Sequence, residues 1–190
     1  MQPDMSKDFE MDNLRAEIEE IYDALEAKEK GKKEGCYMVF NGTNLGLIRN
    51  GKMIDNLDAM SGRQDYQAKK YQNIANLGPI PEGRYFAPQK ERQTITPFNA
   101  VIGVISRLSG LNKGKWNGGP VAWGIRRVWL HPDENTETYG RNNFSIHGGI
   151  LKGSKGCIDI AYQTDKLKAY MDECQEKKVP LYVKYKRDYW

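Results

Sequence analysis

Two residue types that together can carry out nucleophilic catalysis lie ten residues apart in the C-terminal third of the chain. His147 ends one short apolar run, and Cys157 begins another, with a glycine-rich turn between them. The thiolate is the reactive form of cysteine, and a free thiol has a pKa of about 8.5, so a nearby imidazole or cation is needed to form it at neutral pH. The pair therefore predicts a cysteine enzyme with Cys157 as the nucleophile and His147 as its base.

The turn between these two residues supplies further groups for this chemistry. Four glycines lie in or beside it: Gly148, Gly149, Gly153 and Gly156. Because glycine lets backbone amides approach a reacting carbonyl closely, these positions suit an oxyanion hole. Ser154 could orient the thiol or a substrate, and Lys155 adds positive charge if its head group folds toward the site. A buried structural cysteine and a hydrogen-bonded structural histidine are the alternative interpretation of the pair.

Two separate stretches carry a resemblance to a known family. Residues 139–149 and 153–159 resemble the catalytic core of the L,D-transpeptidases, which carry an Ile-His-Gly strand followed by a Ser-His-Gly-Cys turn. Here the connection is shorter, and Lys155 stands where the second histidine is usual. With the Gly-Pro-Ile-Pro-Glu-Gly-Arg-Tyr segment inside residues 76–85, this compact spacing resembles the L,D-transpeptidase-like effectors that type VI secretion systems deliver into rival bacteria. The resemblance covers about residues 36–187.

The resemblance implies an activity on peptidoglycan. Cys157 would attack the carbonyl of meso-diaminopimelate in a tetrapeptide stem and release D-alanine, with His147 as base and the carbonyl of Gly148 orienting its imidazole. Water as acceptor gives an L,D-carboxypeptidase, a free D-amino acid gives exchange, and a second stem gives a 3-3 cross-link; the effectors are associated with the first two. The expected partners are stem peptides, D-amino acids, an immunity protein and a secretion adaptor or chaperone. No cofactor is expected.

Several further residues are candidates for substrate binding. The guanidinium of Arg141 could bind a terminal carboxylate of the stem. Asp159 could bind an amine of the stem, or else cap the following turn. The remaining candidates are Lys155, Gly149, Ser61 and Tyr85, and in the family the neighbourhood of Ser61 borders the substrate cleft. His131 lacks a glycine-rich partner turn and is interpreted as structural.

Composition limits the other classes of function. The chain of 190 residues is 39% hydrophobic and 28% charged, which is ordinary for a globular protein. No stretch approaches the roughly 18 apolar residues of a membrane span, and the N-terminus has no secretory signal pattern, so we expect synthesis in the cytoplasm and secretion by another route. The resemblance implies action in the periplasm of the target cell. A papain-like amidase, in which the cysteine precedes the histidine, and a binding module without turnover remain the alternatives.

The N-terminal part differs from the rest in charge and pattern. Residues 1–34 hold 11 acidic and 6 basic side chains, a net charge of −5, and residues 35–190 hold 23 basic and 14 acidic, a net charge of +9. Apolar residues recur at helical spacing in the acidic part: Leu14, Ile18, Ile21 and Leu25. We therefore predict an acidic amphipathic helix and linker over residues 1–35, which packs back on the catalytic domain or on another chain, and a catalytic domain over residues 36–190. A basic surface also suits nucleic acid, but no aromatic spacing supports that use, and none is predicted.

The sequence predicts a mainly β (α+β) fold for the catalytic domain, with an L,D-transpeptidase-like β-sandwich or bent mixed sheet. Strands are predicted over residues 37–40, 45–48, 53–59, 84–87, 121–130, 144–147, 158–160 and 181–185. Asn50-Gly51 indicates a type I′ hairpin, and Thr164 caps a single C-terminal helix over residues 164–177. Residues 96–119 are expected to form a lid or side wall that includes a short apolar helix, and Trp116 and Trp123 could contact glycan or stem peptide.

The three cysteines leave two states open. Cys36 and Cys174 could pair in an oxidising compartment and leave Cys157 free, but three reduced thiols are the state that we favour from the sequence. Two histidines and no Cys-x-x-Cys predict no metal site.

Overall fold

The fold is known from a computed structural model, which describes residues 35–110, 116–150 and 153–185. Its strands are β1 (Cys36–Phe40), β2 (Asn44–Arg49), β3 (Lys52–Asp58), β4 (Met60–Ser61), β5 (Gly83–Pro88), β6 (Arg92–Thr94), β7 (Arg126–Pro132), β8 (Phe144–His147), β9 (Ile158–Asp159) and β10 (Lys178–Val183). The helices are α2 (Pro97–Leu108), α3 (Gly119–Trp123) and α4 (Thr164–Glu173), with 3₁₀ turns η1 (Lys69–Tyr71) and η2 (Gln89–Glu91). The predicted acidic helix lies outside the described residues.

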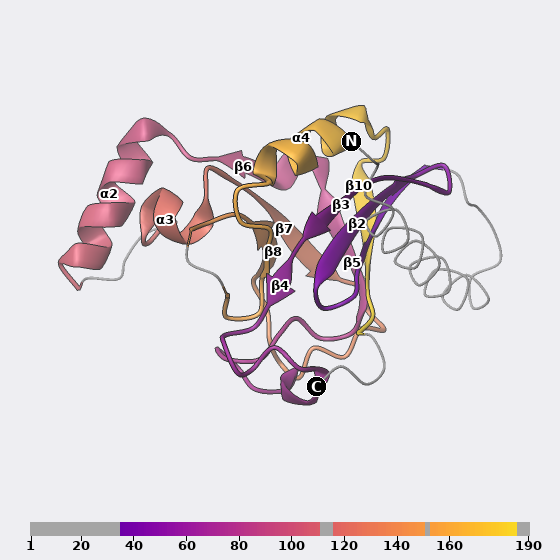
Figure 1. The fold of residues 1–190 in the computed structure, drawn as a ribbon, viewed down its shortest axis with the longest axis horizontal. Coiled ribbons are helices and arrows are strands. Elements are labelled where there is room, and N and C mark those ends of the chain that lie inside the picture. Colours follow the sequence, from indigo (N-terminus) through magenta and orange to yellow (C-terminus); the bar gives the residue numbers. More distant parts are fainter. Residues whose placement is uncertain (1–34, 111–115, 151–152, 186–190) are drawn as a thin grey trace, which may run out of the picture.

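The strands form one mixed sheet in the order β3-β2-β1-β10-β5-β7-β8-β9-β4, and β6 pairs with β7 off this path. The pairs β1/β10 and β8/β9 are parallel, and the other pairs are antiparallel. At the β2–β3 hairpin, Asn50 and Gly51 have φ of 51° and 71°, as a type I′ turn requires. The predicted mainly β fold with a C-terminal helix is confirmed (Figure 1).

Helix α4 closes the core over the sheet. Its apolar side chains Leu167, Tyr170 and Met171 are buried, and the Tyr170 hydroxyl lies 2.8 Å from the carbonyl of Tyr37 and 2.7 Å from that of Ile48. The helix ends at Glu173, four residues earlier than predicted, and its N-cap is Gln163 rather than Thr164. Thr164 is instead the first helical residue, and it is buried.

Helices α2 and α3 form an insertion that projects from one end of the sheet (Figure 1). The helix predicted within residues 98–108 is confirmed as α2. Its inner face packs on α3 through Gly103, where a Cβ would lie 2.1 Å from the carbonyl oxygen of Trp116. Its outer face is apolar and exposed at Phe98, Val101, Ile102, Ile105 and Leu108. None of the described helices is long and apolar enough to cross a membrane.

The prediction of one strand over residues 121–130 was wrong at its start. Residues 119–123 form helix α3, and β7 begins only at Arg126. Gly118 enters the helix with φ of 90°, and Pro120 lies in its first turn, where a missing amide proton costs nothing. The apolar residues Val121 and Trp123 therefore lie on a helix, although their composition alone suits a strand.

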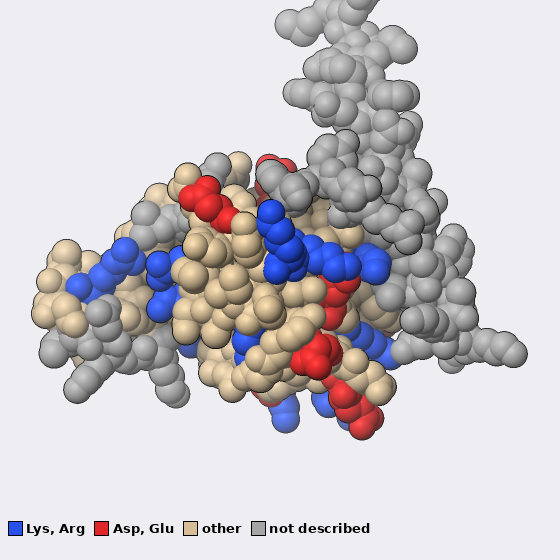
Figure 2. Space-filling model, turned by 90° about the horizontal axis from the view of Figure 1, so that it is seen from below, with Lys and Arg blue, Asp and Glu red and all other residues tan. Residues whose placement is uncertain are grey.

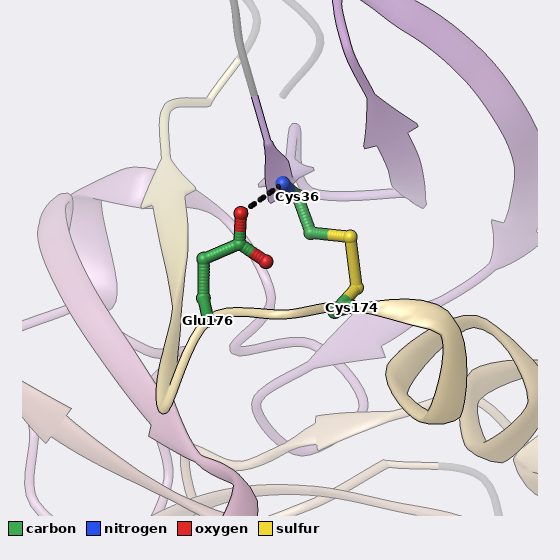
Figure 3. A group of neighbouring side chains, drawn as sticks. All are labelled: Cys36, Cys174 and Glu176. Atoms are coloured by element: carbon green, nitrogen blue, oxygen red, sulfur yellow. Dashed lines mark hydrogen bonds between the residues drawn. A yellow bond between two sulfur atoms is a disulfide. The ribbon is translucent and has the colours of Figure 1, made fainter.

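Cys36 and Cys174 form a disulfide, which corrects the expectation of three reduced thiols (Figure 3). The bond joins the start of β1 to the residue that follows α4, across 138 positions of sequence. Glu176 lies beside it and accepts a hydrogen bond of 2.9 Å from the amide of Cys36. These three residues are the described group whose donor atoms lie close enough for a metal ion. Both sulfurs are bonded to each other in the disulfide, so we interpret this group as a structural cross-link and not as a metal site.

We expect the disulfide to contribute strongly to stability because it closes a loop of this length. Replacing both cysteines with serine should lower the free energy of unfolding by about 3 kcal/mol, which is roughly 6–12 °C in Tm for a chain of this size. Thermal melts with and without reductant check this. Reductant should lower the wild-type Tm to that of the double variant and leave the variant unchanged; equal wild-type Tm values in both conditions would contradict the prediction.

The charged side chains of the domain are distributed over its surface in several groups. On the face shown in Figure 2, Lys and Arg lie in separate places with Asp, Glu and uncharged residues between them. Many are paired: Arg92 and Lys168 both bond Asp172, and Arg126 bonds Asp165. The sequence excess of positive charge is thus partly neutralised locally among the described residues.

Candidate active site

The parallel pair β8/β9 positions the candidate nucleophile. Ile146 and Ile158 are paired in register, and both are completely buried in the core. Because side chains alternate along a strand, Ser145 and Cys157 point to the opposite face. Cys157 is buried, with 9% of the residue exposed, and its Sγ accepts a hydrogen bond of 3.3 Å from Ser145 Oγ. It also donates to the carbonyl of Asn143 at 3.7 Å. The thiol is therefore held in place and protonated.

The imidazole of His147 is oriented by the main chain. Its Nδ1 lies 2.6 Å from the carbonyl oxygen of Gly148, and because a carbonyl only accepts, Nδ1 must carry the proton. Nε2 then holds the free lone pair, which is the state that a general base requires. The ring of Trp123 packs against the imidazole with centroids 4.9 Å apart. His147 and Ser145 are alternate residues of β8, so the imidazole leaves the same face as the hydroxyl that bonds the thiol.

Burial sets the protonation states of both groups. The pKa of His147 is lowered to about 4, chiefly by burial and also by the charge of Arg127, against the opposing effect of the Gly148 carbonyl. Burial also raises the pKa of Cys157, while the Ser145 hydrogen bond and the charges of Arg127 and Arg141 act in the opposite direction. The resting site therefore holds a neutral thiol and a neutral imidazole, because the pair is shielded from solvent.

The turn before Cys157 is held by Ser154 and Gly156. Ser154 Oγ donates to the carbonyl of Cys157 and accepts from the amide of Gly156 at 3.3 Å. Gly156 has φ of 110°, and a Cβ there would lie 2.1 Å from Arg141 Nη2. Ser154 thus shapes the nucleophile turn and does not contact the thiol, and only glycine fits at position 156. Lys155 is exposed.

Arg141 ties together the two stretches that carry the family resemblance. The residue is buried, with an exposed fraction of 9%. It donates to four carbonyl oxygens, those of Gln72, Gly78, Pro79 and Lys155. These contacts fix the Gly-Pro-Ile-Pro segment against the nucleophile turn. The guanidinium that we predicted to bind a substrate carboxylate is already engaged by the main chain.

Two other predicted substrate contacts are buried and act on the same segment. The hydroxyl of Ser61 accepts a hydrogen bond of 2.8 Å from the amide of Ile80, and the hydroxyl of Tyr85 donates one of 2.9 Å to the carbonyl of Pro81. Their exposed fractions are 1% and 0%. In this structure the two hydroxyls bond the main chain of the Gly-Pro-Ile-Pro segment, and their contact with a substrate stays a prediction.

The remaining predicted residues, Asp159 and Gly149, lie beyond His147. Asp159 is paired with His147 in the β8/β9 register, and its carboxylate accepts a hydrogen bond of 2.8 Å from the amide of Ala161. Asp159 thus caps the turn that follows β9, which is one of the two roles predicted for it; the other was binding an amine of the stem. Burial raises the pKa of Asp159 to about 6. Gly149 donates its amide to the carbonyl of Ala161 at 3.2 Å, and its φ of 150° lies in the range that favours glycine.

The structure adds residues that sequence reasoning missed. Ser145 and the Asn143 carbonyl contact the thiol, and Arg127 reaches the site from β7, where it is paired with His147. The alternation along β8 would have placed Ser145 beside His147. The register of β7 against β8 has no signal in the sequence, so Arg127 could not be found.

Solved structures with a similar chain course include three bacterial proteins. Bd1075 of Bdellovibrio bacteriovorus is 16% identical, with 79% of this chain and 48% of that chain covered and a TM-score of 0.47. The L,D-transpeptidase of Xylanimonas cellulosilytica is 12% identical, with 80% and 61% covered and a TM-score of 0.46. The catalytic domain of the E. faecium L,D-transpeptidase is 18% identical, with 80% and 99% covered and a TM-score of 0.41. The chain thus spans less than two thirds of the first two.

Comparison of the sequence with family models gives the assignment. No curated protein sequence matches the chain significantly. The model of the Tlde1 domain matches residues 55–183, which is more than half of the chain and includes both His147 and Cys157. The chain therefore belongs to the Tlde1 domain family, and its resemblance to L,D-transpeptidase-like effectors is confirmed.

Proposed function

We propose that the chain is a peptidoglycan-modifying cysteine enzyme that removes or exchanges the terminal D-alanine of tetrapeptide stems. The observation that carries this proposal is the site on β8 and β9, where a thiol held by Ser145 lies on the same face as a histidine with a free Nε2. Membership of the Tlde1 domain family supports the substrate class.

The first half of the reaction forms an acyl-enzyme. Nε2 of His147 takes the proton of the Cys157 thiol as its sulfur attacks the carbonyl carbon of meso-diaminopimelate. The tetrahedral intermediate collapses with cleavage of the amide bond, and the amine of D-alanine leaves with the proton returned from Nε2. The stem remains attached to Cys157 as a thioester.

The second half is decided by the acceptor. Water, or the amine of a free D-amino acid, gives a proton to His147 Nε2 and attacks the thioester carbon, and the sulfur leaves and recovers the proton. Water yields a tripeptide stem, and a D-amino acid yields an exchanged tetrapeptide. Either product removes donors that a growing wall needs for cross-linking. We therefore propose an antibacterial toxin that is secreted and acts in the periplasm of the target cell, with an immunity protein and a secretion adaptor or chaperone as partners.

Mass spectrometry of purified tetrapeptide muropeptides tests the proposal. The wild-type chain and Cys157→Ala are incubated with the muropeptides, with and without D-methionine. We expect loss of D-alanine, and its replacement by D-methionine when that amino acid is present, with the wild-type chain only. Tetrapeptides that stay unchanged in both samples would refute the proposed activity.

A further inference from the structure

Arg127 lies in a row of polar side chains that crosses four strands. Gln93 of β6 is paired with Arg127 of β7, Arg127 with His147 of β8, and His147 with Asp159 of β9. Because paired residues of neighbouring strands share a face, Arg127 stands on the face that carries His147 and Cys157. It is 4% exposed.

Three tryptophans enclose the guanidinium of Arg127. Its central carbon lies 4.2 Å from the ring centroid of Trp116, 4.9 Å from that of Trp123 and 4.5 Å from that of Trp129. Contacts of this kind stabilise a cation by electrostatic attraction to the faces of the rings, and the attraction is stronger when the contact is desolvated. Trp116 and Trp123 belong to the insertion held by Gly103 of α2, so the insertion fixes the cation in place. This is a different use from the glycan contact predicted for these two residues.

The described contacts of Arg127 are all with neutral groups. Its Nε donates to the side-chain carbonyl of Gln93 at 2.8 Å, and the indoles are uncharged. Its neighbour Arg126, in contrast, is paired with the carboxylate of Asp165. Burial lowers the pKa of Arg127, but a guanidinium starts so high that it stays charged. A buried cation is costly when no anion is paired with it, and no described residue forms an ion pair with Arg127. Its charge interacts with that of Cys157, which becomes negative during acyl transfer.

We propose that Arg127 is a positioning residue whose caged charge favours the thiolate of Cys157 and the neutral imidazole of His147. The proposal rests on the proposed role of Cys157 as nucleophile. Its effect on both groups has the required sign, since the charge of Arg127 lowers the pKa of Cys157 against the effect of burial and also lowers that of His147. Arg127 thus supplies the positive charge that the sequence assigned to Lys155, which is exposed.

Alkylation of Cys157 by iodoacetamide measures this effect without any peptidoglycan substrate. The other two cysteines form the disulfide, so Cys157 is the free thiol of the oxidised chain. Among the described residues, Arg141 is the other charged group that acts on the thiol, and His147 and Asp159 are titratable groups of the adjoining strands; all three are retained in every variant. The rate is followed from pH 6 to pH 10 by mass spectrometry, without reductant, for the wild-type chain and for Arg127→Met, Arg127→Gln and Arg127→Lys.

We expect both neutral variants to alkylate more slowly at pH 7, by about tenfold, with the midpoint of the profile about one pH unit higher. Arg127→Lys should recover most of the rate because it restores the charge. Arg126→Met is the matched control, since Arg126 is the preceding residue of β7 and has its own carboxylate partner; its profile should equal that of the wild-type chain.

A purely structural role for Arg127 gives the opposite result. Loss of the tryptophan cage would then open the site, and the neutral variants would alkylate faster than the wild-type chain with an unchanged or lower midpoint. An equal or faster rate in Arg127→Met and Arg127→Gln would overturn the proposal. If the neutral variants shift the pH profile of alkylation but the wild-type chain leaves muropeptides unchanged, the electrostatic role of Arg127 is supported and only the proposed substrate is refuted.

Discussion

Replacing Cys157 with alanine is expected to reduce the release of D-alanine from tetrapeptide muropeptides by at least about 10⁴-fold. The acyl-enzyme cannot form without the sulfur, and no other described side chain on the face of Ser145 and His147 offers a free thiol. D-Alanine is measured by a coupled oxidase assay, and the acyl-enzyme by the mass of the intact protein.

The folding of the variant provides the control for this result. Alanine removes a hydrogen bond to Ser145 and a contact with the Asn143 carbonyl, so a change of about 1 kcal/mol in the free energy of unfolding is expected, and the Tm should fall by only a few degrees. Cys157→Ser keeps a hydroxyl of nearly the same size and should be almost as inactive. Turnover above one hundredth of the wild-type rate in a folded Cys157→Ala chain would exclude the acyl-enzyme mechanism.

Replacing His147 with alanine is expected to lower kcat by about 10²–10⁴-fold, the usual contribution of a general base. In the wild-type chain, the pKa of about 4 of the His147 imidazole also predicts how activity depends on pH. The base must be neutral, so activity is lost as pH falls through the pKa, and kcat/KM should decline near pH 4 instead of near the usual histidine value of about 6.5. Initial rates from pH 3.5 to pH 9 measure this.

Two variants separate His147 from other titrating groups. His131 is the second histidine of the chain, and it lies on the surface 2.6 Å from the carboxylate of Glu91, so His131→Ala should keep the wild-type rate and profile. Asp159 has a pKa of about 6, and in Asp159→Asn any inflection near pH 6 should disappear while the one near pH 4 stays. A profile of kcat/KM that is flat to pH 3.5 in the wild-type chain would argue against His147 as the base.

Local sequence signals predicted most of the sheet correctly. The Asn50-Gly51 turn and the apolar runs on either side of it depend on neighbouring residues, and the structure confirms the hairpin. The error over residues 121–123 arose because Val121 and Trp123 suit a strand, while the helix there depends on packing against Gly103 of α2, a contact that composition does not reveal.

The site was predictable only in part, for a related reason. The two glycine-flanked positions His147 and Cys157 were found because their chemistry and spacing are local. The contacts of Ser61, Tyr85 and Arg141 depend on burial, and each of these polar groups bonds the main chain. A polar residue type indicates which contacts are possible, but only the fold determines whether a substrate or a carbonyl makes them.

The disulfide limits the order in which this chain can fold and oxidise. Three cysteines allow three different pairings in an unfolded chain, and two of them consume Cys157. In the folded chain Cys157 is buried against Ser145, while Cys36 and Cys174 meet beside the end of α4. Folding that precedes oxidation therefore selects the Cys36–Cys174 disulfide, which leaves Cys157 as a free thiol. Oxidation that precedes folding would trap most molecules in forms in which Cys157 is already part of a disulfide.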